Sequence, residues 1–144
     1  MKKLKTILLV DDCEATNLIH RLIIEKYGCV EEVVETLNGA EAMAFLKTKR
    51  NGAYPQPELV FLDVNMPVMN GWEFLDAYRE LPESQLAGVV VVMLTTSTNP
   101  DDRTRAQELN EISLFASKPL SIDTIDKVLA QHYPDSLRED YPAR

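Results

Sequence analysis

Five polar residues follow short apolar runs in this sequence of 144 residues, and their side chains could act together on an anionic group. Asp11 and Asp12 end one run, Asp63 ends another, and Thr95 and Lys118 follow two more. Aspartate carboxylates can serve as nucleophiles and as ligands for hard divalent cations. A hydroxyl and an ammonium supply hydrogen-bond donors. The set therefore predicts a metal site that stabilises negative charge during a group transfer.

To act together, these residues must lie at one edge of the fold, and the order of elements along the chain achieves this. Short apolar runs predict strands at 7–10, 32–36, 59–62, 89–94 and 114–117. Helical spacing predicts helices at 14–26, 39–48 and 72–78, with two more that open after Asn99 and Ser121. The alternation favours an α/β fold, a doubly wound parallel sheet of order 2-1-3-4-5 with helices on both faces.

The electrostatics of the three aspartates indicate what else such a site needs. The carboxyl ends of strands one and three flank the switch point of the sheet, so we expect the three acids to lie a few ångströms apart. At about 4 Å each pair would repel by roughly 4 kcal/mol at an effective dielectric near 20. Lys118 and one divalent cation would neutralise them, and all-oxygen ligands favour Mg²⁺, with Mn²⁺ as a substitute. A neutral site of this kind would stabilise a phosphoryl group during transfer.

Short motifs around these residues occur in a fixed order along the chain. They are Val10-Asp11-Asp12, Leu62-Asp63-Val64-Asn65-Met66-Pro67, Gly71, Leu94-Thr95-Thr96-Ser97 and Ser117-Lys118-Pro119. In order and spacing, residues 5–132 resemble the receiver domain of response regulators in two-component signalling, similar to the stand-alone chemotaxis response regulator. The resemblance implies a flavodoxin-like (βα)5 three-layer sandwich, with a receiver domain at 1–132. We expect residues 133–144 to form a polar C-terminal tail without an output domain.

The resemblance also implies a role for each acidic residue. Asp63 is the expected phosphoacceptor, a nucleophile that attacks the phosphohistidine of a partner kinase. Asp12 and Asp63 would contact the metal directly, and the backbone carbonyl of Asn65 would add a ligand. Asp11 would act on the metal mostly through water. The function implied is therefore Mg²⁺-dependent phosphorylation of Asp63.

Other residues are implied to bind the phosphoryl group and to respond to it. Thr95 would donate its hydroxyl to one phosphoryl oxygen, and Lys118 would pair with another. Phe115 matches an aromatic switch residue of the family, although an aromatic residue in a final strand equally suits the core. Pro119 matches a proline that follows a cis peptide bond. Phosphorylation would then change how the face of the fourth helix, fifth strand and fifth helix binds a partner.

The partners implied by the resemblance are proteins. A sensor histidine kinase, with phytochrome-type kinases as one candidate, or a phosphotransfer protein would supply the phosphoryl group, and a downstream protein would read the signal. A net charge of −8 argues against direct binding of nucleic acid. The apolar runs are too short to span a bilayer, so we expect a cytoplasmic protein. We also expect it to be a monomer or a weak dimer.

Two other functions stay open at the level of sequence. A phosphatase of the haloacid dehalogenase type also forms an aspartyl phosphate, but it needs an acid two residues after the nucleophile, where this chain has Asn65. Turnover of external substrates is therefore not expected. A degenerate receiver that binds partners without phosphorylation would lack one of the acids or the lysine, and this chain has all of them.

Four further residues have structural interpretations. His20 lies on the first predicted helix and is interpreted as a surface residue. Trp72 shares helical spacing with Leu75, which indicates packing. Cys13 would begin a helix and Cys29 would follow one, so both are expected to be reduced thiols that are buried or half-buried.

Overall fold

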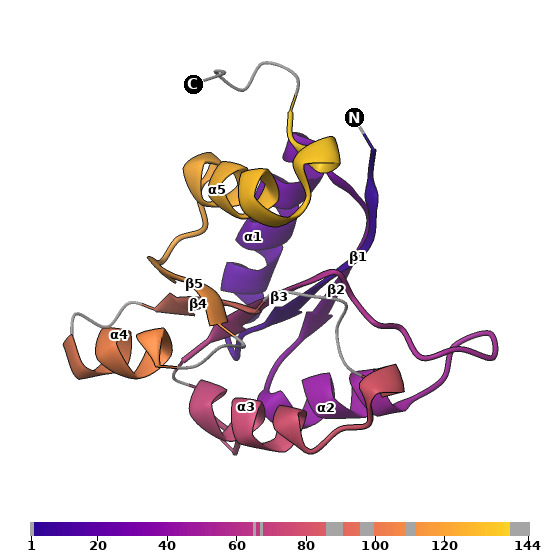
Figure 1. The fold of residues 1–144 in the computed structure, drawn as a ribbon, viewed down its shortest axis with the longest axis vertical. Helices are drawn as coiled ribbons and strands as arrows, with labels where there is room; N and C mark the ends of the chain where they lie inside the picture. Colours follow the sequence, from indigo (N-terminus) through magenta and orange to yellow (C-terminus); the bar gives the residue numbers. More distant parts are fainter. Residues whose placement is uncertain are drawn as a thin grey trace.

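Strands and helices alternate in the computed structural model, which describes residues 2–64, 66, 68–85, 91–95, 100–108 and 112–138 (Figure 1). The strands are β1 (Leu4–Val10), β2 (Val30–Thr36), β3 (Leu59–Asp63), β4 (Val91–Thr95) and β5 (Ile112–Ser117). The helices are α1 (Glu14–Tyr27), α2 (Gly39–Lys47), α3 (Gly71–Arg79), α4 (Pro100–Gln107) and α5 (Ile122–His132), with short 3₁₀ turns η1 (Glu83–Gln85) and η2 (Pro134–Ser136). The strands form one parallel sheet of order β2-β1-β3-β4-β5, which confirms the predicted doubly wound fold.

Local sequence signals account for where these helices begin and end. Asn38 and Ser121 cap α2 and α5 through side-chain oxygens that accept from backbone N–H groups. Gly28 ends α1 in the left-handed conformation, at φ 83°. Asn70 and Glu73 form a capping box at the start of α3.

Among the described residues, no helix combines the length and the apolar character needed to cross a bilayer.

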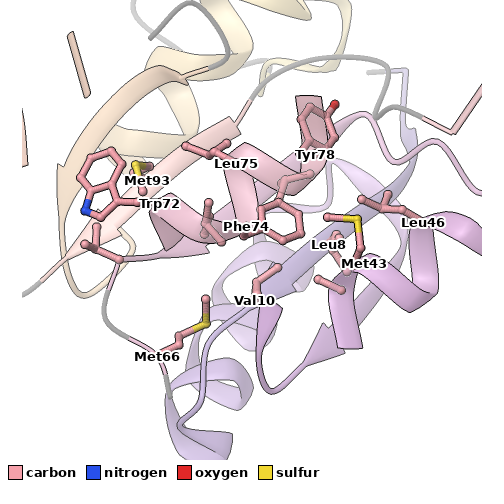
Figure 2. Packing of buried hydrophobic residues seen from close by; sticks show 14 of the residues in the cluster. Leu8, Val10, Met43, Leu46, Met66, Trp72, Phe74, Leu75, Tyr78 and Met93 are labelled. Carbon is pink, nitrogen blue, oxygen red and sulfur yellow. The ribbon is translucent and has the colours of Figure 1, made fainter. Parts of the chain in front are cut away.

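Apolar side chains alternate between the two faces of the sheet and form a core on each face. Helices α1 and α5 cover one face, and α2 and α3 cover the other (Figure 1). In β1, Leu8 and Val10 point toward α2 and α3, whereas Ile7 and Leu9 point toward α1 and α5. Figure 2 shows the core between the sheet and helices α2 and α3. Trp72 lies in this core and is 7% exposed, which confirms its predicted packing role. Because both faces are covered, the strand ends are where polar groups can gather.

Helix α1 departs from the usual amphipathic pattern, because it buries two polar residues beside two large apolar ones and exposes three apolar residues. The exposed fractions of Leu18, Ile19 and Leu22 are 50%, 51% and 56%. The side of the helix that faces the sheet carries Asn17, His20, Ile24 and Tyr27. His20 is only 2% exposed, so its interpretation as a surface residue is wrong. It is buried because its ring, like the amide of Asn17, hydrogen-bonds to the backbone of a loop beside the sheet.

Residues 133–138, which follow α5, pack onto the domain. The backbone N–H of Lys2 donates to the carbonyl of Asp135 at 2.8 Å, and the Ser136 hydroxyl donates to the carbonyl of Lys2 at 2.5 Å. Arg138 forms an ion pair with Asp126 of α5, with 2.8 Å between Nη2 and Oδ2. The sequence prediction missed this packing because it considered only the polar composition of the segment, which does not reveal its contacts with Lys2 and with Asp126.

Candidate functional site

The three aspartates singled out in the sequence lie together at the carboxyl end of the sheet. One carboxylate oxygen from each of Asp11, Asp12 and Asp63 lies within 4.8 Å of the other two. This proximity follows from strand register, because Val10 pairs with Leu62 and the next residue on each strand is an aspartate. Asp11 and Asp63 are buried, at 4% and 6% exposure, whereas Asp12 is exposed. The cluster is therefore open to solvent on the side of Asp12.

Lys118 reaches into this cluster from the end of β5. Its Nζ lies 2.5 Å from Oδ2 of Asp11 and 3.0 Å from Oδ1 of Asp63, and its side chain is 14% exposed. Burial alone would lower the pKa of Lys118, but hydrogen bonds to Asp11 and Asp63 outweigh burial and hold the pKa above its ordinary value. One ammonium thus bridges two buried carboxylates, and the cluster keeps an excess of negative charge.

Backbone and side-chain hydrogen bonds fix Asp11 in place. Its Oδ1 accepts from the N–H of Cys13 at 3.0 Å, and its own N–H donates to the carbonyl of Thr36 at 3.1 Å. The amide of Asn17 donates to the carbonyls of both Asp11 and Thr36, at 3.0 and 3.1 Å. These bonds tie the ends of β1 and β2 to α1. The carboxylate of Asp11 is thereby oriented toward Lys118.

Cys13 opens α1 beside the acids, and its surroundings differ from the prediction. Its thiol is exposed, whereas Cys29 is buried, so the expectation of burial is wrong for Cys13 and confirmed for Cys29. Hydrogen bonds from Thr16 lower the pKa of the Cys13 thiol. Burial raises the pKa of Cys29 to about 11.

Thr95 ends β4 next to Asp63. It is 1% exposed, and it follows Leu94, the register partner of Asp63. Its carbonyl accepts a hydrogen bond from the N–H of Lys118 at 2.8 Å, which links the ends of β4 and β5. This backbone hydrogen bond therefore holds Thr95 beside Lys118, the two residues predicted to bind the phosphoryl group.

Gly71 is the residue through which α3 approaches the acid cluster. A Cβ at this position would lie 2.6 Å from the backbone oxygen of Asp63 and 3.0 Å from the Cα of Val64. The N–H of Gly71 donates to the carbonyl of Val64 at 2.9 Å, which closes the loop after β3. Only glycine allows this approach, because any side chain would push against the backbone that carries Asp63.

Phe115 lies on β5, half-buried, at the edge between the core and a groove. It pairs in register with Met93 and packs against the core of α2 and α3. The groove beside it, between α4 and β5, is lined by Ala106, Gln107, Ile112, Ser113, Leu114 and Phe115. The guanidinium of Arg103 lies over the Phe115 ring, 5.3 Å from its centroid, and that of Arg105 lies 4.5 Å from the centroid of the Trp72 ring. This position agrees with a packing role and with a switch role alike.

Some predicted residues lie outside the part of the chain that the structure describes, and others were not foreseen. Asn65, Pro67, Thr96 and Ser97 belong to the first group. A cis peptide bond joins Lys118 to Pro119.

The sequence prediction gave no role to Asn17 and misplaced His20. Their spacing with Ile24 and Tyr27 was the available signal, since these four residues recur at i, i+3, i+7 and i+10.

The donor set of the cluster fits a hard divalent cation. All three side chains offer carboxylate oxygens, and the exposed edge at Asp12 leaves room for the waters that Mg²⁺ retains. Lys118 contacts two of the carboxylates, so a cation would balance the charge that remains. The residues present therefore suit Mg²⁺ better than a metal that prefers nitrogen or sulfur ligands.

A doubly wound sheet that carries an acid cluster and a lysine at its switch point defines a class of signalling domain. The chain belongs to the response regulator receiver domain family, whose match covers residues 7–130. It is 32% identical over 128 residues to the response regulator Rcp1 of Synechocystis sp. (strain ATCC 27184 / PCC 6803 / Kazusa), which covers 87% of this chain and 84% of Rcp1.

Solved structures of response regulators share the fold. The two-component response regulator from Cytophaga hutchinsonii superposes with a TM-score of 0.80 at 26% identity, covering 90% of this chain and 97% of that one. The bacteriophytochrome response regulator AtBRR superposes with a TM-score of 0.72 at 28% identity, covering 99% and 98%. Receiver domains bind Mg²⁺ at an acidic pocket and interact with histidine kinases and phosphotransfer proteins, and this chain has a cluster of three aspartates at the corresponding edge of its sheet.

Proposed function

We propose that this receiver domain accepts a phosphoryl group on Asp63, in a Mg²⁺-dependent reaction, from a histidine kinase or a phosphotransfer protein. The observation that carries the proposal is the environment of the Asp63 carboxylate. It is buried, it lies 3.0 Å from Lys118 Nζ, and it shares a group of oxygens within 4.8 Å with Asp11 and Asp12. A structural turn or helix cap would need one of these acids, and would not need all three beside a lysine.

The chemistry follows from the groups at the site. A carboxylate oxygen of Asp63 attacks the phosphorus of a phosphohistidine, a P–O bond forms, and the P–N bond breaks. The leaving imidazole keeps the electron pair of the P–N bond and takes up a proton. Lys118 pairs with the phosphoryl oxygens, and the Thr95 hydroxyl donates to another of them. Mg²⁺, held by Asp12, Asp63 and the Asn65 carbonyl, with Asp11 acting through water, would neutralise charge on the phosphoryl oxygens when bound.

The proposed output is a change in partner binding at the face of α4, β5 and α5. Phosphorylation would favour a conformation in which Thr95 moves toward the phosphoryl group and Phe115 turns inward. Two features support this face. The groove between α4 and β5 ends at Phe115, and the Arg103 guanidinium covers the Phe115 ring from outside. If Phe115 only packs in the core and does not turn, phosphorylation would change partner binding at this face through α4 alone.

The partners proposed for this chain are proteins. The bacteriophytochrome response regulator AtBRR supports a phytochrome-type kinase as one candidate donor. A downstream protein would bind the α4-β5-α5 face, and the charge of −8 disfavours nucleic acid in that role. We propose no turnover of external substrates, because Asn65 stands where an aspartyl phosphatase needs an acid.

The test is intact-protein mass spectrometry after treatment with acetyl phosphate and Mg²⁺. The wild-type chain should gain one phosphoryl group, and the gain should disappear with excess EDTA. Asp63→Asn should gain none, whereas Asp76→Asn, a change of an exposed aspartate on α3, should react like the wild type. A phosphoryl group retained on Asp63→Asn would refute the acceptor assignment, and steady phosphate release from a phosphomonoester would indicate a phosphatase instead.

A further inference from the structure

His20 is a buried polar side chain that the proposed chemistry does not use directly. It lies on α1 with 2% of its surface exposed. Its Nε2 accepts a hydrogen bond from the backbone N–H of Leu120 at 3.2 Å, although the two residues are 100 positions apart in the sequence. Leu120 is itself 2% exposed and follows Lys118 by two residues. The ring thus contacts the loop that carries the site lysine.

The segment from Lys118 to Leu120 is short of backbone donors. Pro119 has no N–H, so only Lys118 and Leu120 can donate. The N–H of Lys118 bonds to the Thr95 carbonyl at 2.8 Å, and the N–H of Leu120 bonds to His20. The segment is therefore held from two different elements, β4 on one side and α1 on the other. Both of its backbone donors are used in holding it.

The side chain of Lys118 depends on this double attachment. Its Nζ reaches Asp11 and Asp63 at 2.5 and 3.0 Å from a backbone that is fixed just before and just after Pro119. Without the bond to His20, the backbone at Leu120 would lose its hydrogen bond to α1, and only apolar packing of the Leu120 side chain would hold that end of the loop. A shift of the lysine by an ångström is large on the scale of a 3 Å contact.

The ring must be neutral to make this bond. Because Nε2 accepts, the ring proton is on Nδ1, and a doubly protonated ring would set one N–H against another. Burial lowers the pKa of His20, which favours the neutral form. An apolar residue of similar size would fill the space and would leave the buried N–H of Leu120 without its acceptor.

We propose that His20 is a positioning residue that holds the Lys118–Leu120 segment so that Lys118 stays on Asp11 and Asp63. The inference rests on the proposed phosphorylation of Asp63, since that reaction is what the position of Lys118 serves. His20 touches neither the acids nor the phosphoryl group. It acts through the backbone of Leu120.

The test uses the full chain with His20→Leu, which removes the acceptor, and His20→Gln, whose side-chain oxygen can replace Nε2. The first measurement is the rate of phosphorylation by acetyl phosphate with Mg²⁺, followed by intact mass. His20→Leu should slow it on the order of tenfold, and His20→Gln should restore most of the rate. The matched control is Tyr27→Phe, which removes a buried hydrogen bond to Asp126 at the other end of α1 and should leave the rate unchanged.

The second measurement is amide hydrogen exchange at Leu120 by NMR, which does not depend on phosphorylation. Exchange should speed up in His20→Leu and stay slow in His20→Gln and Tyr27→Phe. If His20→Leu does not fold, His20→Met removes the acceptor with an unbranched side chain and serves in its place. Unchanged exchange at Leu120, or equal slowing of phosphorylation by the glutamine and leucine variants, would overturn the proposal. If the wild type takes up no phosphoryl group, the proposed function fails, and Leu120 exchange still decides whether His20 holds the loop.

Discussion

Two buried carboxylate sites lie at opposite ends of α1, and they differ in how their charge is balanced. At one end, Asp126 accepts from the Tyr27 hydroxyl at 2.6 Å and from Arg138, with contacts at 2.9 and 2.8 Å to its two oxygens. At the other end, one lysine bridges Asp11 and Asp63 while a third aspartate lies within 4.8 Å. Asp126 is fully satisfied by its neighbours, whereas the acid cluster holds more negative charge than its lysine can offset.

This difference separates a structural ion pair from a reactive one. A single carboxylate that meets a guanidinium fork and a hydroxyl has its hydrogen-bonding capacity filled, and it stabilises the fold. A cluster with uncompensated charge is a cost to the folded state unless a cation or an incoming group relieves it. Burial alone does not distinguish the two sites, since Asp126 and Asp11 are both 4% exposed.

The largest expected effect comes from Gly71→Ala, which would disturb only the reactive end. The new Cβ would meet the Asp63 backbone at 2.6 Å, so the chain should lose about 3 kcal/mol of unfolding free energy, as in overpacked cores, and be phosphorylated poorly. Gly39→Ala is the matched control, because the three nearest contacts of its Cβ, at 2.8, 2.8 and 3.1 Å, are all with the side chain of Met69, whereas the nearest contact at Gly71 is with backbone. Urea unfolding of both variants measures the contrast. Equal losses would mean that the approach at Gly71 is not special.

The two carboxylate sites should respond to neutralisation with opposite signs. Asp126→Asn weakens the Arg138 fork and should cost about 2 kcal/mol of unfolding free energy. Asp63→Asn relieves repulsion in the cluster and should raise the unfolding free energy by about 1 kcal/mol in buffer without Mg²⁺. Urea titrations at pH 7 with EDTA compare the two variants with the wild type. Destabilisation by both changes would contradict the excess of charge inferred at Asp63.

The pH dependence of the unfolding free energy should show that ionised Asp126, paired with Arg138, stabilises the fold. The hydrogen bonds from Arg138 hold the pKa of Asp126 below its ordinary value, with help from Tyr27 and against the effect of burial. A carboxyl with a lowered folded pKa stabilises the protein fully above its unfolded pKa of about 4, and this stabilisation is lost as the pH falls through the folded value.

The difference in unfolding free energy between wild type and Asp126→Asn should therefore be largest near neutral pH and shrink below about pH 4. Asp76→Asn, which breaks an exposed pair with Arg79, should differ little from the wild type at any pH. Thermal or urea unfolding across the pH range provides the measurement. A difference that grows on acidification would show that the pKa of Asp126 is raised in the folded chain.

The smallest effect expected is in thiol labelling, which reports on the two ends of α1 separately. Cys13 is exposed with a lowered pKa, whereas Cys29 is buried with a pKa of about 11. Iodoacetamide at neutral pH should therefore add one label to the native chain and two to the unfolded chain. Cys13→Ser should remove the native label. Labelling of Cys29 in the native chain would show that this end opens readily.

Sequence patterns were sufficient for the sheet and for the convergence of the acids. The runs that end at Asp11 and Asp63 predict strands, and the topology of a doubly wound sheet places those ends side by side. Gly28 and Asn38 marked helix boundaries through local conformation and capping, which depend on few neighbours. These features are predictable because each is decided within one element or by the order of elements.

The contacts that were missed depend on residues far apart in the sequence. His20 bonds to a backbone group 100 positions away, and Tyr27 bonds to Asp126 across 99 positions. Helical spacing with Asn17, Ile24 and Tyr27 indicates the buried face of α1, but nothing in the local sequence identifies the backbone N–H of Leu120 as the partner of His20. The exposure of Cys13 at the start of α1 was likewise missed. Arg138, which falls within the segment expected to be a polar tail, pairs with Asp126 of α5.

The way α4 is attached has a consequence for its mechanics. This helix, all of whose residues are described, buries only Ala106, and the guanidinium groups of two of its arginines lie over the rings of Phe115 and Trp72. Cation–π contacts of this kind contribute about 0.5–1 kcal/mol each when exposed, far less than an interlocked apolar face. Rings and guanidinium planes can also slide past one another without unpacking. Small free energies are therefore enough to change the tilt or position of α4 while the sheet beneath it stays rigid.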